Sequence, residues 1–127
     1  MTEASPHKSR PGLARLRAAT VYSVQGLRAA YRHESAFRQE LVLAALLVPA
    51  AVLLDTSLLE KALLLGAVGI VLVTELLNSA IEATVDRISF EDHEFAKRAK
   101  DIGSAAVLVS LVNCAVVWGL VVANAYL

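Results

Sequence analysis

Apolar residues are concentrated in three long stretches of the chain, and charged residues lie between them. Residues 41–54, 62–74 and 102–127 contain no Asp, Glu, Lys or Arg. Apolar segments that approach 20 residues are typical of membrane-spanning helices, because a helix of that length crosses the hydrocarbon core. The pattern therefore predicts an all-α integral membrane protein with three spanning helices, over about 36–54, 60–85 and 102–126.

The first predicted span needs residues beyond its uncharged stretch of about 14 residues, which is short of the roughly 20 required. Extended back to residue 36 it becomes long enough, and Glu40 then lies near the membrane surface. We expect Pro49 to bend this helix without ending it, because lipid offers the backbone no other hydrogen-bond partner. The spacing of Ser57 and Glu60 predicts a capping box that opens the second span.

The N-terminal arm is polar and interrupted by prolines, and residues 1–12 are predicted to be a disordered tail. Over 13–33, apolar and small residues recur every three or four positions, which predicts an amphipathic helix. The members of this series are Leu13, Leu16, Thr20, Val24, Leu27 and Tyr31. Because several arginines occupy the other faces, we expect the helix to lie on the membrane surface against anionic head groups. A helix packed on soluble protein is the alternative.

The composition supports a membrane protein and excludes one class of partner. Hydrophobic residues make up 57% of the chain, the mean hydropathy is +0.58 and the formal net charge is +0. Nucleic-acid binding requires a surplus of basic residues on one face, so no nucleic-acid partner is expected. The single cysteine, Cys114, excludes an internal disulfide.

The distribution of Lys and Arg predicts the orientation in the membrane. The loop between the first two spans holds only Lys61, whereas the N-terminal arm and the 86–101 loop are rich in basic residues. These residues are Lys8, Arg10, Arg15, Arg17, Arg28, Arg32 and Arg38 in the arm, and Arg87, Lys97, Arg98 and Lys100 in the loop. By the positive-inside rule the N-terminus and the 86–101 loop are predicted to be cytoplasmic.

The second predicted span carries a stripe of polar residues on one helical face, formed by Glu75, Asn78, Glu82 and Asp86. A carboxylate at the centre of a span costs roughly 2.5 to 3.5 kcal/mol, so these residues require a functional or structural reason. The stripe is compatible with hydrogen bonding between helices, with a proton or cation pathway, and with a site that coordinates an ion for chemistry.

The charged segment after the second span favours the last of these interpretations. It contains His93, Lys97, Arg98, Lys100 and Asp101, which combine cations that bind phosphate with a carboxylate that can hold Mg²⁺. The sequence has neither the P-loop motif nor the glycine-rich loop of protein kinases. A nucleotide site, if present, must therefore be of another kind.

Two long motifs resemble the signature of the prokaryotic diacylglycerol kinases. They are Glu75-Leu-Leu-Asn-Ser-Ala-Ile-Glu-Ala-Thr-Val-Asp-Arg87 and Ala99-Lys-Asp-Ile-Gly-Ser-Ala-Ala-Val107. The segments Gly26-Leu-Arg-Ala-Ala and Ala36-Phe-Arg-Gln-Glu40, with Glu34 between them, resemble the family as well. Together these motifs extend from about Arg15 to the third span, in the order and spacing of the family.

The resemblance implies one membrane kinase domain over 13–127, with a surface helix and three spans per subunit in a homotrimer whose active sites are shared between neighbours. It also implies that the γ-phosphoryl group of ATP is transferred, with Mg²⁺, to the primary hydroxyl of diacylglycerol. The product would be phosphatidic acid, formed at the cytoplasmic face of the bacterial inner membrane. Such kinases return diacylglycerol to phospholipid synthesis.

The resemblance also implies a role for individual residues. Glu75 is expected to be the general base, Asn78 a supporting hydrogen-bonding group, and Glu34 and Glu82 the metal ligands. The residues expected to contact ATP are Arg15, Tyr22, Glu34, Glu82, Glu91, His93, Lys100 and Asp101. The residues expected to contact the lipid are Ser23, Arg28, Glu40, Glu75 and Ser104.

The sequence departs from the family pattern at Val24, where relatives often carry an aromatic residue, and before His93, where a tyrosine is common. The closest rival is the related undecaprenol kinase, which has a similar E-x-x-N-S-A-I-E helix. The strings Val-Asp-Arg87 and Lys-Asp-Ile-Gly-Ser-Ala-Ala favour the diacylglycerol type. A small transport or structural membrane protein is the alternative from another class.

Overall fold

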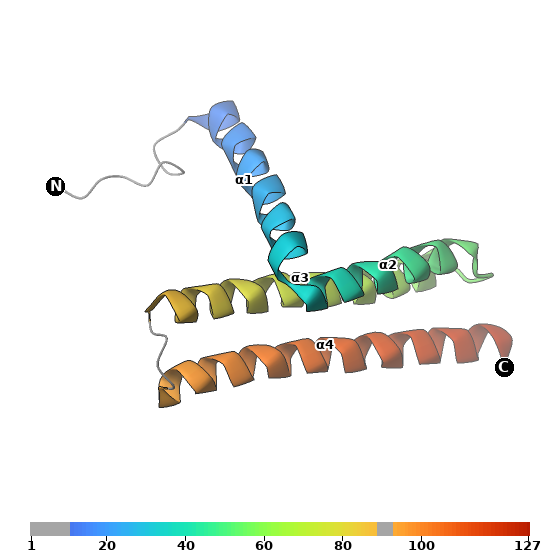
Figure 1. The fold of residues 1–127 in the computed structure, drawn as a ribbon. Coiled ribbons are helices and arrows are strands. Elements are labelled where there is room, and N and C mark those ends of the chain that lie inside the picture. Colours follow the sequence, from blue (N-terminus) through green and yellow to red (C-terminus); the bar gives the residue numbers. More distant parts are fainter. Residues whose placement is uncertain (1–10, 89–92) are drawn as a thin grey trace. The chain divides into compact units, whose positions relative to one another are not determined.

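The computed structural model describes residues 11–88 and 93–127. Within these residues the chain forms four α-helices: α1 (Gly12–His33), α2 (Ser35–Leu53), α3 (Leu58–Ile88) and α4 (Glu94–Tyr126) (Figure 1). They belong to two compact units, Met1–Glu34 and Ser35–Leu127, which are described separately. The prediction of an all-α chain is confirmed. Of the helices described, α2, α3 and α4 are long and apolar enough to cross a membrane.

The helix α1 forms where the sequence predicts the N-terminal helix. It begins at Gly12, whose φ of +30° is a conformation that side-chain-bearing residues rarely adopt. It ends at His33, because Glu34 is extended and donates its backbone N–H to the carbonyl of Ala30 at 2.9 Å. The helix is therefore confirmed, whereas its position on a membrane surface stays a prediction. The tail over residues 1–10 lies outside the described residues.

The three spanning helices differ in length. The helix α2 has 19 residues, α3 has 31 and α4 has 33, and the most apolar window of α4 has a mean hydropathy of 2.4. At 1.5 Å per residue α3 and α4 are about 46 and 50 Å long, whereas the hydrocarbon core is about 30 Å thick. One or both ends of these two helices must therefore extend beyond the hydrocarbon core. Pro49 lies inside α2, which continues to Leu53 as predicted.

The beginning of α4 corrects one sequence-based expectation. The segment 86–101 was expected to be a loop, but α3 continues to Ile88 and α4 begins at Glu94. His93 caps α4, since its Nδ1 accepts the backbone N–H of Phe95 at 3.1 Å. The charged side chains then pair one helical turn apart, Lys97 with Asp101 and Arg98 with Glu94. The structure therefore has helix where a loop was expected over 86–88 and 94–101, since capping and these pairs favour a helix; residues 89–92 lie outside the described residues.

The helix α3 packs against both α2 and α4. One buried cluster lies along the middle of the three helices and another lies toward the α2–α3 turn. The buried alanines Ala44, Ala51 and Ala67 contribute little side-chain volume, so the backbones approach closely, as is usual where helices pack in a membrane. The clusters consist of Ala44, Ala67, Val68, Val71 and Cys114, and of Ala51, Leu64 and Val121.

The turn between α2 and α3 is closed by hydrogen bonds to the backbone. We call residues 54–61 together with residues 118–126 of α4 the hairpin end. The predicted capping box is present: Glu60 Oε1 accepts the backbone N–H of Ser57 at 3.2 Å, and Ser57 Oγ accepts that of Glu60 at 3.1 Å. Lys61 Nζ donates to the carbonyls of Ala51 and Val52, at 3.1 and 3.0 Å, and also to that of Leu54. A cation thus occupies the end of α2, where helix carbonyls lack partners.

The C-terminal part of α4, residues 118–126, binds to the same end of the unit. Trp118 Nε1 donates to the Leu64 carbonyl at 3.2 Å, and the Tyr126 hydroxyl accepts the backbone N–H of Asp55 at 3.0 Å. Asn124 Nδ2 donates to Glu60 Oε2 at 3.4 Å. These bonds join residues more than fifty positions apart, so they fix the register of α4 against α3.

Candidate active site

The polar face of α3 lies buried within the second unit. Glu75 and Asn78 retain only 4% and 7% of their accessible surface, and Ser79 is buried beside them. Ser79 Oγ donates to Glu75 Oε1 at 3.4 Å, and Asn78 Nδ2 donates to Glu82 Oε1 at 3.3 Å. Both bonds join residues four positions apart, as the helical repeat requires. Together with Gly103 of α4, we call Glu75, Asn78, Ser79 and Glu82 the carboxylate end.

Burial decreases along this face toward the end of α3. Glu75 is buried, Glu82 is half-buried and Asp86 is exposed. Seven residues separate Glu75 from Glu82, which places Glu75 about 10 Å deeper along the helix axis. A carboxylate in an apolar span is unfavourable, so the buried position of Glu75 indicates a role beyond packing. The half-buried Glu82 remains accessible to a hydrophilic ligand.

Glu40 of α2 belongs to the same neighbourhood. Its side chain is buried and acts electrostatically on Glu75. Its Oε2 atom is buried and makes no hydrogen bond with any described residue, and the same is true of Asn78 Oδ1. Buried polar atoms usually have partners, and exceptions often mark functional sites. Glu40, which is predicted to contact the lipid, and Glu75, which is predicted to be the general base, thus lie close enough to interact electrostatically.

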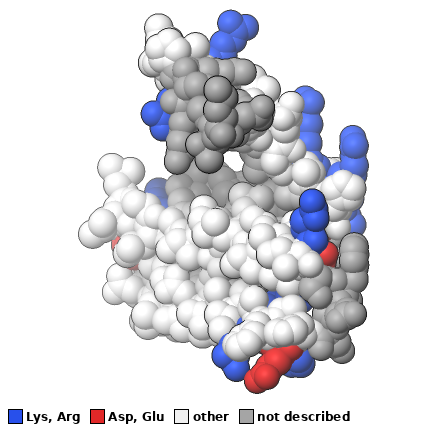
Figure 2. Space-filling view, turned by 90° about the vertical axis from the view of Figure 1, so that its left-hand side faces the viewer, with Lys and Arg blue, Asp and Glu red and all other residues white. Residues whose placement is uncertain are grey.

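The ends of α3 and α4 beyond the carboxylate end carry ion pairs. Lys100 Nζ lies 2.5 Å from Asp86 Oδ1, and Lys97 Nζ lies 2.6 Å from Asp101 Oδ2. Figure 2 shows acidic and basic side chains next to one another where α4 begins. Lys100 and Asp101, both predicted to contact ATP, therefore lie one helical turn or less from Gly103, and each is ion-paired.

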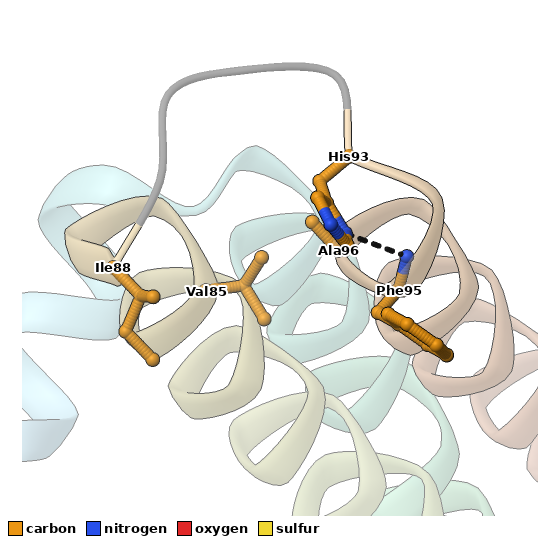
Figure 3. A pocket seen from close by; sticks show the side chains of 5 residues that line it. All are labelled: Val85, Ile88, His93, Phe95 and Ala96. Carbon is orange, nitrogen blue, oxygen red and sulfur yellow. Dashed lines mark hydrogen bonds between the residues drawn. The ribbon is translucent and has the colours of Figure 1, made fainter.

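A cavity of about 380 Å³ lies between the end of α3 and the beginning of α4. As Figure 3 shows, it is lined by Val85 and Ile88 from α3 and by His93, Phe95 and Ala96. The His93 ring stacks on the Phe95 ring with centroids 5.5 Å apart and an interplanar angle of 27°. The Arg98 guanidinium lies 5.1 Å from the centroid of the same Phe95 ring. The cavity thus combines aliphatic walls with two stacked aromatic rings, one of which also lies against a guanidinium group.

The remaining predicted site residues lie on other parts of the chain. Five of them belong to the first unit: Arg15, Tyr22, Ser23, Arg28 and Glu34. Arg15 and Tyr22 are seven residues apart and share a side of α1, while Ser23 Oγ donates to the Ala19 carbonyl at 2.8 Å. Ser104 is exposed on α4, and Glu91 lies outside the described residues. The roles of all these residues stay predictions.

The predicted metal ligands belong to different units, Glu34 to the first and Glu82 to the second. Among residues 11–88 and 93–127, no group of three or more His, Cys, Asp or Glu side chains is arranged to hold a metal ion. Mg²⁺ needs only one or two carboxylates when phosphate oxygens and waters complete its shell. The half-buried Glu82 carboxylate, whose Oε1 is oriented by Asn78, fits that kind of ligand.

Sequence reasoning missed two features of this region. The ion pair between Asp86 and Lys100 joins the facing ends of α3 and α4. The sequence could have indicated this pair, because the two residues carry opposite charges on either side of a short connection between helices. The contact of Gly103 with Asn78 was signalled only by a glycine inside an apolar helix. Such a signal is weak, because five further glycines lie along the chain.

Comparisons with known proteins show which family has a sequence similar to that of this chain. The family model for prokaryotic diacylglycerol kinase matches residues 21–122. The chain is 52% identical to the diacylglycerol kinase of Pseudomonas aeruginosa over 114 residues, which cover 90% of this chain and 93% of that protein. It is 49% identical to the Escherichia coli protein of the same name over 107 residues, covering 84% and 88% of the two chains.

A third relative, the diacylglycerol kinase of Haemophilus influenzae, is 46% identical over 108 residues, which cover 85% of this chain and 92% of that protein. The matched regions include α2, α3 and nearly all of α4, and with them the whole carboxylate end. The chain therefore belongs to the prokaryotic diacylglycerol kinase family.

Proposed function

We propose that this protein transfers the γ-phosphoryl group of ATP to the primary hydroxyl of diacylglycerol and so forms phosphatidic acid. The observation that carries the proposal is the pair of buried polar side chains, Glu75 and Asn78, inside a membrane-spanning helix of a chain that belongs to this family. The reaction takes place at the cytoplasmic face of the bacterial inner membrane and returns diacylglycerol to phospholipid synthesis.

Glu75 is the general base in this proposal. Its carboxylate takes the proton of the lipid hydroxyl while the hydroxyl oxygen forms a bond to the γ-phosphorus. The bond between that phosphorus and the bridging oxygen breaks, and ADP leaves with the electron pair. The depth of Glu75 suits a substrate that diffuses in the membrane plane, because the hydroxyl reaches it without leaving the bilayer. The hydrogen bond from Ser79 orients the carboxylate.

Glu82 and Glu34 would hold Mg²⁺, and Asn78 orients the Glu82 carboxylate through its hydrogen bond. When bound, the metal ion neutralises charge on the phosphate oxygens. Lys100 supplies a further positive charge for the phosphates at the same end of α4. The other residues proposed to contact ATP are Arg15, Tyr22, Glu91, His93 and Asp101, and those proposed to contact the lipid are Ser23, Arg28, Glu40 and Ser104.

The proposed assembly is a homotrimer whose active sites are shared between neighbouring subunits. In support, α4 exposes large apolar side chains along most of its length, among them Leu108, Val112, Val116 and Leu120. A second copy of the chain and lipid are the two surroundings in which such a surface is stable. The distribution of Lys and Arg supports an N-terminus and an α3–α4 connection on the cytoplasmic side.

The test is a transfer assay with purified protein in mixed micelles and radiolabelled ATP. Diacylglycerol and undecaprenol are supplied in separate reactions, each with and without Mg²⁺. We expect label in phosphatidic acid only, and only with Mg²⁺ present. Label in undecaprenyl phosphate instead would assign the protein to the rival lipid substrate, and no label in either lipid would contradict the proposed activity.

A further inference from the structure

Gly103 of α4 lies directly against the Asn78 side chain of α3. A Cβ atom added at Gly103 would lie 2.2 Å from Asn78 Oδ1, 3.3 Å from its Cγ and 3.9 Å from its Cβ. Real Cβ atoms do not approach other atoms within 3.0 Å. The space that any side chain at position 103 needs is therefore occupied by the Asn78 amide. Both residues are buried, so this contact lies inside the unit.

The other side of the same amide is held by Glu82. Asn78 Nδ2 donates to Glu82 Oε1 at 3.3 Å, which assigns the amide orientation, because a carboxylate accepts hydrogen bonds and does not donate them. Asn78 Oδ1 then points toward Gly103 and has no hydrogen-bond partner among the described residues. At Gly103 a hydrogen takes the direction that a Cβ would have, so only this hydrogen faces Asn78 Oδ1.

We propose that Gly103 is a positioning residue of the active site. By carrying no side chain, it leaves the space in which the Asn78 amide lies, and it thereby keeps Asn78 Nδ2 directed at the Glu82 carboxylate. The proposal rests on the proposed function, in which Asn78 and Glu82 belong to the active site. It adds a residue on α4 that acts only through Asn78, and it makes the distance between the α3 and α4 backbones part of the catalytic geometry.

Other glycines of the spanning helices provide matched controls. Gly119 lies in the same helix as Gly103, and a Cβ added there has no atom within 4 Å; the same holds for Gly66 and Gly69 of α3. Replacing a helical glycine by alanine favours the helix by reducing the freedom of the unfolded chain. Gly103→Ala and Gly119→Ala therefore share this backbone effect, and they differ in the contact with Asn78.

The first measurement is the NMR spectrum of protein labelled with [¹⁵N]asparagine in detergent micelles. The sequence contains three asparagines, Asn78, Asn113 and Asn124, so their side-chain NH₂ signals can be assigned by substitution. In Gly103→Ala we expect the Asn78 NH₂ signals to move, because the methyl group forces the amide to rotate away from Glu82. In Gly119→Ala we expect the Asn78 signals to stay in place. This measurement does not depend on kinase activity.

The second measurement is the kinase assay with Mg²⁺ varied. In Gly103→Ala we expect kcat to fall by about 10- to 100-fold, in line with the effect of small misplacements of active-site groups. The Mg²⁺ concentration for half-maximal rate should rise, while the KM for diacylglycerol stays within about twofold, since Gly103 acts on Glu82. Gly119→Ala should retain the kinetics of the unsubstituted protein.

The double variant Gly103→Ala/Asn78→Ala keeps the test decisive if Gly103→Ala folds poorly. Because alanine at 78 removes the amide, the double variant should regain the stability that Gly103→Ala loses in denaturant unfolding. Unmoved Asn78 signals in Gly103→Ala, equal kinetic losses in both single variants, or a double variant no more stable than Gly103→Ala would each overturn the proposal. An inactive unsubstituted protein would contradict the proposed function, while the NMR measurement would still decide the role of Gly103.

Discussion

The hairpin end and the carboxylate end of the second unit use the same kinds of polar residue in opposite ways. At the hairpin end, Glu60 and Lys61 bond to backbone groups and close the chain on itself. At the carboxylate end, Glu75 and Glu82 accept longer bonds from side chains of their own helix. Among the described residues, buried oxygens without a hydrogen-bond partner occur at Asn78 of the carboxylate end, at the neighbouring Glu40 and also at Thr56 of the hairpin end.

This difference separates residues that stabilise the fold from residues that are available to a ligand. A side chain that satisfies backbone groups lowers the free energy of the folded chain, because the groups at helix ends have no partner within their own helix. A carboxylate that accepts bonds from side chains, and not from backbone groups, contributes less to stability and can also accept a proton or a metal ion. We therefore expect substitutions at the two ends to separate activity from stability.

The largest effect on activity is expected for Glu75→Gln. Glutamine has nearly the same shape and keeps an oxygen for the Ser79 hydroxyl, but it cannot take the proton of the lipid hydroxyl. We expect kcat to fall by roughly 10²- to 10⁴-fold, the usual contribution of a general base, with unfolding in denaturant no easier than before. Steady-state kinetics in mixed micelles and SDS-induced unfolding measure the two quantities.

Glu60→Gln is the matched control, since it changes the same residue type on the same helix at the hairpin end. It weakens the cap of α3 and should leave kcat unchanged. A Glu75→Gln variant that folds and keeps full activity would leave the kinase assignment standing and remove Glu75 as its base.

The largest effect on stability is expected for Lys61→Met. Methionine keeps the length of the side chain but removes the ammonium group that bonds three carbonyls at the end of α2. Hydrogen bonds from a charged donor contribute about 1.5 to 3 kcal/mol each, and the partly exposed position lowers that, so we expect a total loss of about 2 kcal/mol. SDS-induced unfolding checks this value, with kcat unchanged at a temperature where the variant is folded.

Lys97→Met provides the comparison for Lys61→Met. Lys97 is exposed on α4 and forms an ion pair with Asp101 one helical turn away. Loss of this ion pair should lower the free energy of unfolding by a few tenths of a kcal/mol. Equal destabilisation by the two substitutions would refute the capping role of Lys61.

A smaller effect on stability is expected for Ser57→Ala. The serine hydroxyl accepts the backbone N–H of Glu60, the third residue of α3, and its removal at an N-cap typically costs about 1 kcal/mol. Because Ser57 and Glu60 bond to each other's backbone, the double variant with Glu60→Ala, which removes the acceptor of the Ser57 N–H, should lose less than the sum of the single losses. Strict additivity in the unfolding free energies would contradict a coupled capping box.

The features that were predictable from sequence are those set within one helix or one turn. The stripe from Glu75 to Glu82 follows from the helical repeat alone, and the cap at Ser57 follows from a spacing of three residues. The beginning of α4 is not predicted, because the charges of 94–101 exclude this segment from a span and so favour a loop between spans. In the structure the cap at His93 and the pairs along the first turns favour a helix.

The features that were not predictable depend on the register between helices. Gly103 meets Asn78, Lys100 meets Asp86 and Trp118 meets Leu64 only because α4 lies at one particular height along α3. Nothing local to either helix determines that height. It results from the packing of small and large apolar residues over the whole length of the two helices.

The smallest effect on stability is expected for Arg98→Met. This variant also tests whether the active site extends beyond the carboxylate end to Arg98. Arg98 pairs with Glu94 at 3.3 Å and lies over the Phe95 ring, but both members of the pair are more than half exposed. Exposed pairs one helical turn apart contribute about 0.3 to 0.5 kcal/mol, and salt screens them. We expect a loss below about 1 kcal/mol that shrinks at high salt, with the KM for ATP unchanged.

If Arg98→Met instead raised the KM for ATP severalfold while unfolding stayed unchanged, Arg98 would belong to the nucleotide site. The site would then extend from the carboxylate end across the cavity between α3 and α4, because Arg98 covers the Phe95 ring that lines this cavity. Glu94→Gln is the control, since it breaks the same ion pair and leaves the guanidinium over the ring. An effect on KM shared by both variants would point to the ion pair, and one confined to Arg98→Met would point to the guanidinium itself.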